Sequence, residues 1–121
     1  MSEPKVFSSQ ALTIKVREDG PGFILEWTGK SNEREPGKFI TPILTEIMEK
    51  AGQNPVVLDF GNLEYMNSST ITPIIRILDT AKKNKQKIKI LYKKALKWQD
   101  LSFSALTIFK TEDGQISIEG V

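Results

Sequence analysis

The chain has 121 residues, of which 39% are hydrophobic and 26% are charged, with a formal net charge of +2. This size and composition are typical of one globular domain, so we expect a single domain over residues 1–121, with residues 1–10 as a loose N-terminal lead-in. Cysteine and histidine are both absent, which excludes thiolate nucleophiles, imidazole bases and zinc sites built from these ligands. Carboxylate, lysine or tyrosine chemistry stays open on composition alone. The spacing of Asp59, Glu64, Asp79 and Asp100 does not indicate a catalytic pair, and we expect no catalytic residue, no metal and no cofactor.

Hydropathy along the chain bears on its location. No apolar stretch is long enough to cross a bilayer, and the first residues lack the apolar segment of a signal peptide. The sequence therefore predicts a cytoplasmic protein.

The first half of the chain predicts a hairpin, a helix and a buried strand. Apolar and polar residues alternate over residues 12–16, and a dense turn signal at 18–22 leads into an apolar return segment at 23–27. The apolar residues of 39–51 recur with the spacing of an amphipathic helix. The nearly continuous apolar run at 55–60 is typical of a central, parallel strand covered on both faces.

The second half continues with alternating helices and strands. Residues 61–70 form a polar loop, and the apolar residues of 71–81 have helical spacing. A strand is predicted at 87–92, a third helix around 101–109, and an edge strand at 116–118. Helices that separate strands predict an α/β fold: an N-terminal β-hairpin followed by alternating strands and helices, with a mixed sheet of four or five strands that carries the helices.

Between the buried strand and the second helix lies a polar segment, Asn67-Ser68-Ser69-Thr70. The first backbone N–H groups of a helix lack intrahelical partners, and these side chains are good helix caps, so one interpretation is purely structural. A phosphate on Ser68 or Ser69 would also be stabilised there, by the free N–H groups and the helix dipole. Thr72-Pro73 taken alone predicts a helix that begins at Pro73, with Thr72 as its cap.

The stretch from Val56 to Ser69, an apolar strand that runs into a loop ending in Asn-Ser-Ser, resembles the signature of STAS domains, the anti-sigma-factor antagonists of bacterial partner switching. The resemblance covers residues 10–112 and implies a STAS-like domain that binds a protein partner and has no catalytic activity. It implies that Ser68 is the phosphoacceptor, with Ser69 as the alternative, because Ser68 takes the position of the family's first serine. Asn67 stands where the family usually has Asp, and Thr70 where it usually has Gly. The family pattern implies that the second helix begins near Ser69, so a start at Ser69 or Thr70 is favoured and the start at Pro73 stays open.

The resemblance also implies a partner-binding surface around this segment. Its expected members are the end of the loop, the start of the helix and one basic residue on the helix: Glu64, Tyr65, Met66, Asn67, Ser68, Ser69, Thr70 and Arg76. The implied partners are an anti-sigma factor that is a serine-kinase-like ATPase, or a signalling enzyme, together with a serine phosphatase. We expect the chain itself to be a monomer or a weak dimer.

A second candidate contact surface follows the strand at 87–92. Apolar residues recur there at uneven spacing: Leu96, Trp98, Leu101 and Phe103. Uneven spacing leaves some of these side chains outside the core, so we expect a partly exposed apolar patch beside the serine loop.

Two other functions remain open on the sequence. The first is a constitutive interaction or scaffold domain whose serines only cap the helix. The second, which we rank lower, is a nucleic-acid or anionic-surface binder that uses the eight lysines from Lys82 to Lys97, a segment without acidic residues. The structural explanation of these lysines is a helix end followed by the exposed side of a strand.

Overall fold

The computed structural model describes residues 3–121, which form seven strands, three α-helices and one 3-10 helix. In chain order the elements are β1 (Lys5–Ser9), β2 (Leu12–Asp19), β3 (Gly22–Ser31), α1 (Gly37–Ala51), β4 (Val56–Asp59), β5 (Leu63–Met66), α2 (Ser68–Lys83), β6 (Ile88–Tyr92), α3 (Lys97–Ser104), the 3-10 helix η1 (Ala105–Phe109) and β7 (Ile116–Gly120). None of the helices in the described residues combines the length and the apolar character needed to span a membrane. The predicted α/β class is confirmed, and the sheet has more strands than the four or five expected.

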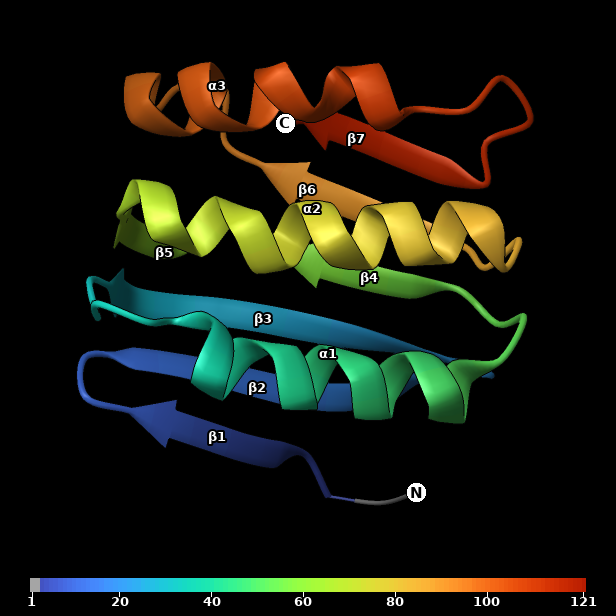
Figure 1. Cartoon of the computed structure of the whole chain (residues 1–121), viewed down its shortest axis with the longest axis horizontal. Coiled ribbons are helices and arrows are strands. Elements are labelled where there is room, and N and C mark those ends of the chain that lie inside the picture. The colour runs from blue at the N-terminus through green and yellow to red at the C-terminus, as the bar shows by residue number, and fades with distance from the viewer. Residues whose placement is uncertain (1–2) are drawn as a thin grey trace.

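The strands form one mixed sheet in the order β1-β2-β3-β4-β6-β7, and β5 pairs with β3 beside this path. The pairs β1–β2 and β2–β3 are antiparallel, whereas β3, β4, β6 and β7 run parallel to one another. Parallel neighbours need crossover connections, and α1, α2 and α3 all cross the same face of the sheet (Figure 1). The N-termini of the helices therefore gather at the end of the molecule where the parallel strands finish (Figure 1).

The core lies between the sheet and the helices. Alternate strand residues such as Leu12 and Ile14 point into it and are at most 1% exposed. Three buried aromatic rings pack in its middle: the ring centroids of Trp27 and Phe60 are 4.7 Å apart, and those of Phe60 and Phe103 are 4.6 Å apart. These rings tie β3, the residue after β4, and α3 together.

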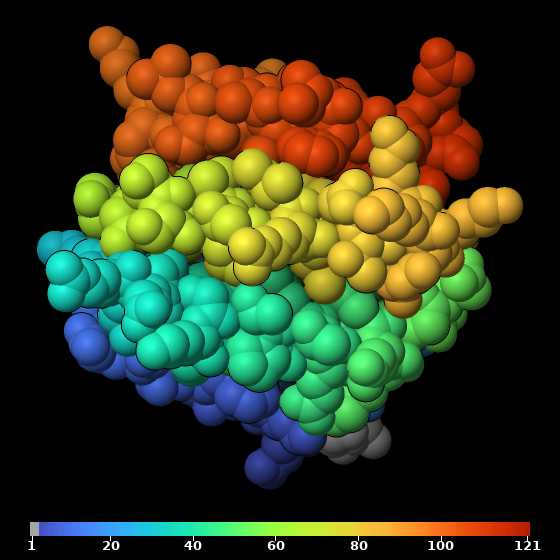
Figure 2. All heavy atoms as spheres, in the orientation of Figure 1, coloured from blue at the N-terminus to red at the C-terminus, as the bar shows by residue number. Residues whose placement is uncertain are grey.

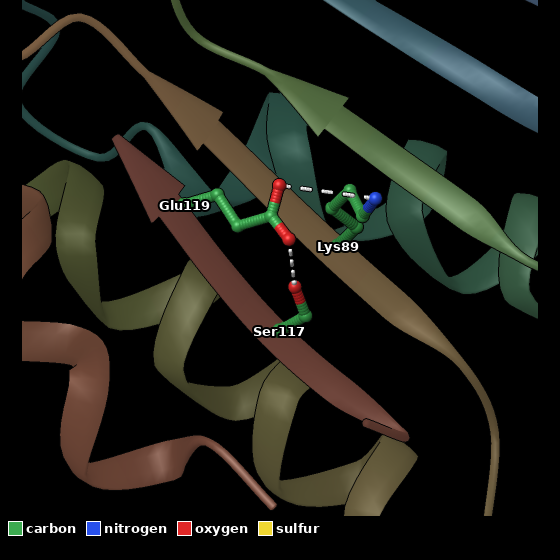
Figure 3. Close-up of polar contacts among 3 residues, drawn as sticks. All are labelled: Lys89, Ser117 and Glu119. Atoms are coloured by element: carbon green, nitrogen blue, oxygen red, sulfur yellow. Dashed lines mark hydrogen bonds and ion pairs between the residues drawn. The ribbon is translucent and has the colours of Figure 1, made fainter. Parts of the chain in front are cut away.

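The opposite face of the sheet carries no helix in the described part of the chain (Figure 1), so the prediction that the strand at 55–60 is covered on both faces is wrong. Val57 and Asp59 of β4 are half-buried on this face. Lys89 of β6 and Glu119 of β7 lie on this face, with Nζ and Oε2 3.9 Å apart, and the Ser117 hydroxyl donates to the same carboxylate over 3.3 Å (Figure 3). About half of each charged side chain stays exposed, at 46% for Lys89 and 52% for Glu119, so this pair adds little to stability. It marks the solvent side of the sheet, as the alternation of Lys89 with buried Ile88 and Ile90 predicted.

Two segments expected to be irregular are strands. The prediction of a loose lead-in over residues 1–10 is wrong for Lys5–Ser9, which pair with β2 along their full length. Residues 1 and 2 lie outside the described residues. The 61–70 loop contains β5, which pairs with the last part of β3. The register between β3 and β5 shifts at Gly29, whose φ of +84° favours glycine. A Cβ at this position would also collide with the carbonyl oxygen of Ala11.

α2 begins at Ser68, one residue before the favoured start, and the alternative start at Pro73 is wrong. Asn67 sets this boundary, because its side-chain Oδ1 accepts the N–H of Thr70 over 3.1 Å. Pro73 lies inside the helix, where its missing N–H costs about 3 kcal/mol in an exposed setting. Its ring is buried against the core, and this packing offsets part of that cost.

Candidate functional site

The predicted serine segment lies at the N-terminus of α2, at the end of the molecule where the parallel strands finish (Figure 1). Ser68 and Ser69 are the first two residues of this helix of 16 residues, and both are exposed. Their N–H groups lie in the first turn, where no intrahelical carbonyl is available to them. Together with the positive end of the helix dipole, these N–H groups favour an anionic group on Ser68.

A buried hydrogen-bond network holds this N-terminus in place. The Thr70 hydroxyl lies 2.8 Å from Asn67 Oδ1 and 2.7 Å from the hydroxyl of Ser31. Since Asn67 Oδ1 only accepts, Thr70 donates to it and the Ser31 hydroxyl donates to Thr70. The Asn67 N–H donates to the Ser31 carbonyl over 2.9 Å, and Asn67 Nδ2 donates to the carbonyl of Glu33 over 2.8 Å. The start of α2 is thereby attached to the end of β3 and the loop after it.

This network is built by the two residues that depart from the STAS pattern. The side chain of an Asp at position 67 would accept from Thr70, but it has no N–H group that could donate to the carbonyl of Glu33. A Gly at position 70 would have no hydroxyl to join Asn67 to Ser31. Ser31 and Glu33 were not predicted from the sequence, because they lie 34 to 39 residues from their partners and no local pattern marks them.

A second buried clamp fixes the segment that leads to the serines. Gln99 of α3 is 0% exposed, and its Nε2 donates to the carbonyls of Phe60 over 2.7 Å and Leu63 over 2.9 Å. Its Oε1 accepts the N–H of Lys93 over 2.7 Å. The start of β5, the end of β6 and α3 are therefore held together by one side chain, which sequence analysis also missed.

A shallow groove of about 300 Å³ opens beside Ser68, between α2 and α3. It is lined by Met66, Asn67, Ser68, Ile71 and Ser102. Glu64 and Tyr65 precede the groove on β5; both are exposed, and Tyr65 keeps 48% of its surface accessible. Six of the eight predicted contact residues thus lie on one continuous stretch at the surface: Glu64, Tyr65, Met66, Asn67, Ser68 and Ser69.

The remaining two predicted contact residues have different positions. Thr70 is 0% exposed, so it supports the site from below. Arg76 is exposed on the side of α2 that faces α1, where it lines a small cavity of about 80 Å³ with Thr41 and Thr80. The structure does not bring Arg76 together with the groove beside Ser68.

The predicted apolar patch after β6 is present without one of its members. Phe103 is 0% exposed and Trp98 is half-buried, whereas Leu96 is 37% and Leu101 is 75% exposed. Ser102, which follows Leu101, lines the groove beside Ser68. Leu101 is therefore next along the chain to a residue of the serine site.

The lysines from 82 to 97 do not form one stripe. Lys82, Lys83, Lys85 and Lys87 lie between the end of α2 and the start of β6, and α2 ends at the opposite end of the molecule from Ser68 (Figure 1). Lys93, Lys94 and Lys97 follow β6, at the same end as Ser68. Lys89 lies on the open face of the sheet (Figure 3). This division agrees with the structural explanation of the lysines as a helix end and the exposed side of a strand.

The two clearly perturbed titratable groups among the described residues lie away from the serine site. A hydrogen bond with Glu46 raises the pKa of Lys50, and a hydrogen bond with the Thr111 side chain lowers the pKa of Asp113. No group of three or more potential metal ligands occurs in residues 3–121. The chemistry of the site therefore rests on hydroxyls, amides and backbone N–H groups.

No family model and no curated protein matches the sequence. Among solved structures, an anti-sigma factor antagonist from Mycobacterium paratuberculosis is similar with a TM-score of 0.64 and 10% identity, over 89% of this chain and 93% of that one. A chain in the structure of the diguanylate cyclase SiaD in complex with its activator SiaC, from Pseudomonas aeruginosa, is similar with a TM-score of 0.63 and 18% identity, over 95% and 99%. An uncharacterized protein of the DUF3478 family with a SpoIIAA-like fold, from Shewanella loihica, is similar with a TM-score of 0.52 and 16% identity, over 98% and 90%. The chain therefore has a STAS-like fold.

Proposed function

We propose that the chain is a non-enzymatic, cytoplasmic regulator whose binding to a protein partner is controlled by reversible phosphorylation of Ser68, with Ser69 as the alternative acceptor. The position of Ser68 carries this proposal. Its hydroxyl is exposed at the first residue of α2, beside a groove, on a backbone held by the buried Asn67–Thr70–Ser31 network. A kinase can reach such a hydroxyl without unfolding the segment around it.

The solved structures of similar fold support a protein as the ligand. One is an anti-sigma factor antagonist, and another belongs to a complex between a cyclase and its activator. By analogy, the partner is an anti-sigma factor that acts as a serine-kinase-like ATPase, or a signalling enzyme. A serine phosphatase then returns the chain to its unmodified state.

The proposed switch works through charge at a fixed position. In the unmodified chain, the partner contacts Glu64, Tyr65 and Met66 together with the Ser68 hydroxyl. A phosphate adds close to two negative charges and three acceptor oxygens, which the free N–H groups of the first turn and the helix dipole stabilise. The phosphate fills the groove and repels an apolar or acidic partner surface, so the partner dissociates faster.

The proposal is tested by mass spectrometry of the protein recovered from its own host cells under several growth conditions. We expect one phosphate that changes with condition and maps to Ser68 within the peptide of residues 62–76. Ser68→Ala removes it, whereas Ser104→Ala, at an exposed serine of α3, leaves it unchanged. A phosphate lost only in Ser69→Ala assigns the alternative acceptor.

Complete coverage of this peptide without phosphate, under every condition, would contradict the switch. The serines would then be helix caps in a constitutive interaction domain. If the phosphate is found, the partner retained by Ser68→Ala is expected to be lost by Ser68→Asp. Equal binding to the two variants would show that the modification does not control the partner.

A further inference from the structure

α3 and η1 present an apolar face to solvent. Toward the sheet they bury Phe103 and Leu106, at 0% and 3% exposure. On the other side Leu101 is 75% exposed and Ile108 is 80% exposed, with exposed Ala105 between them. Large apolar side chains clustered in this way mark interaction surfaces more often than isolated ones do.

This face continues into the groove that holds Ser68. Ala105, the first residue of η1, follows Leu101 by four residues and Ser102 by three, so it neighbours both side chains on the surface. Ser102 lines the groove with Met66 and Ile71, which are half-buried. α2 and α3 lie side by side on the helical face of the molecule (Figure 2), with the groove between them and the apolar face on the outer side of α3 and η1.

Positive charge gathers at one end of this surface. Lys93, Lys94 and Lys97 are exposed at the start of α3, and among residues 3–121 none of them is in an ion pair. The N-terminus of α3 adds the positive end of its dipole. One acidic residue, Asp100, lies in the first turn of the helix. A partner that covers the surface therefore gains from negative charge at this end.

We propose that the surface between α2 and α3 docks an amphipathic helix of the partner, with acidic residues that meet Lys93, Lys94 and Lys97. The apolar stripe of that helix covers Leu101 of α3 and Ile108 of η1, which are seven residues apart. At helical rises of about 1.5 to 2.0 Å per residue this is about 10 to 13 Å, which matches about two turns of a docked helix. A concave groove favours a helix over a flat lipid surface. This inference rests on the proposed function and adds the chemistry of the docked segment.

The inference also explains why a phosphate on Ser68 releases the partner. Ser68 lines the same groove, so the phosphate brings negative charge to a surface that binds an acidic helix. Like charges in one partly desolvated groove repel strongly, which lowers the affinity.

The test is selection from a displayed library of helix-forming peptides with randomised positions, against the purified full chain with unmodified Ser68. We expect enriched peptides with apolar residues at spacings of three and four and with Asp or Glu at one end. For a labelled peptide from this set, Leu101→Ser and the double variant Lys94→Glu/Lys97→Glu each weaken binding about tenfold in fluorescence anisotropy. The control Lys82→Glu/Lys85→Glu, at the other end of the molecule, changes it less than about twofold.

Three results would overturn the inference. The first is enrichment of peptides without acidic residues, and the second is binding that survives Leu101→Ser, a variant that folds because the side chain is exposed. The third is binding to vesicles of phosphatidylserine and phosphatidylcholine that depends on Leu101 and Lys97 while no peptide is enriched, since this assigns the surface to a membrane.

Ser68→Asp separates this inference from the proposed function. Peptides that bind this variant as tightly as the unmodified chain support the docked helix and contradict the switch. A phosphate on Ser68 in host cells together with failure to enrich any peptide contradicts the docked helix and leaves the switch in place.

Discussion

Gln99→Leu tests whether the buried glutamine clamp holds the segment that leads to Ser68. The substitution keeps the side-chain size nearly constant and removes hydrogen bonds of 2.7 to 2.9 Å to Phe60, Leu63 and Lys93. At about 1 kcal/mol for each bond, the free energy of unfolding falls by about 3 kcal/mol. The N–H of Lys93 is left without its side-chain partner, which adds to this loss. The carbonyl of Phe60 still accepts the N–H of Leu63 at 3.0 Å, which lessens it.

The assay is urea unfolding at neutral pH, followed by far-ultraviolet circular dichroism, with thermal unfolding as a second measurement. With an unfolding entropy of about 2.1 cal/mol/K per residue, the loss of about 3 kcal/mol lowers the Tm by about 12 °C. The matched control is Gln53→Leu, at an exposed glutamine after α1, which is expected to stay within about 0.5 kcal/mol of the parent. A loss of less than about 1 kcal/mol in Gln99→Leu would refute the assignment of Gln99 as a clamp.

Gln99→Glu separates the donating from the accepting role of the same side chain. The carboxylate still accepts the N–H of Lys93 but turns a buried negative charge toward the carbonyls of Phe60 and Leu63. Burial next to acceptors raises the pKa of the new carboxyl, so the protonated form is favoured in the folded chain. The destabilisation is therefore largest above the raised pKa and shrinks as the pH falls through it. An unfolding free energy that falls in parallel with that of the parent as the pH drops would contradict this.

Asn67→Asp is expected to lower the unfolding free energy by about 1 kcal/mol at pH 7. The hydrogen bond to the Glu33 carbonyl is lost, whereas the helix dipole favours the new charge and limits the loss. Stability equal to the parent in urea unfolding would show that this bond contributes nothing. The unfolding free energy of Trp27→Phe is expected to stay within about 1 kcal/mol of the parent value. The buried indole N–H has no hydrogen-bond partner among residues 3–121, so its removal offsets the lost packing. A loss above about 3 kcal/mol would reveal a partner. The pKa of Asp113 is lowered in the folded chain, chiefly by Thr111, so its contribution is present above the ordinary value of 3.8 and is lost as the pH falls through the lower folded value. Asp113→Asn should therefore flatten this part of the stability profile between about pH 2 and 5, and profiles of equal slope would disprove the shift.

The sequence by itself determined the elements that bury an apolar face. α1 and the alternating residues of β2 and β6 follow directly from periodic apolar residues, because such residues need a core on one side. β4 follows from its nearly continuous apolar run, whereas the single covered face of this strand was decided by the placement of the helices. β1 and β5 carry too little of this pattern, since Phe7 is only half-buried and Leu63 is the one fully buried residue of β5. Short strands of this kind are defined by backbone pairing with β2 and β3, which no local pattern shows.

The candidate site divides in the same way. Local cap chemistry marked Ser68 and Ser69 as candidate caps of a helix, and the family pattern favoured a start at Ser69 or Thr70, whereas the helix begins at Ser68. Ser31 and Glu33 joined the site only through the tertiary structure, because the hydrogen bonds to Asn67 and Thr70 span 34 to 39 residues of chain.

The orientation of α3 was decided by tertiary structure alone. The helix and η1 contain two apolar stripes, one with Phe103 and Leu106 and the other with Leu101 and Ile108, and helical spacing does not tell which one faces the sheet. The stripe that is buried also contains Gln99, whose three hydrogen bonds to backbone groups satisfy its amide away from water. The other stripe was left in solvent, where it forms part of the surface that we assign to the partner.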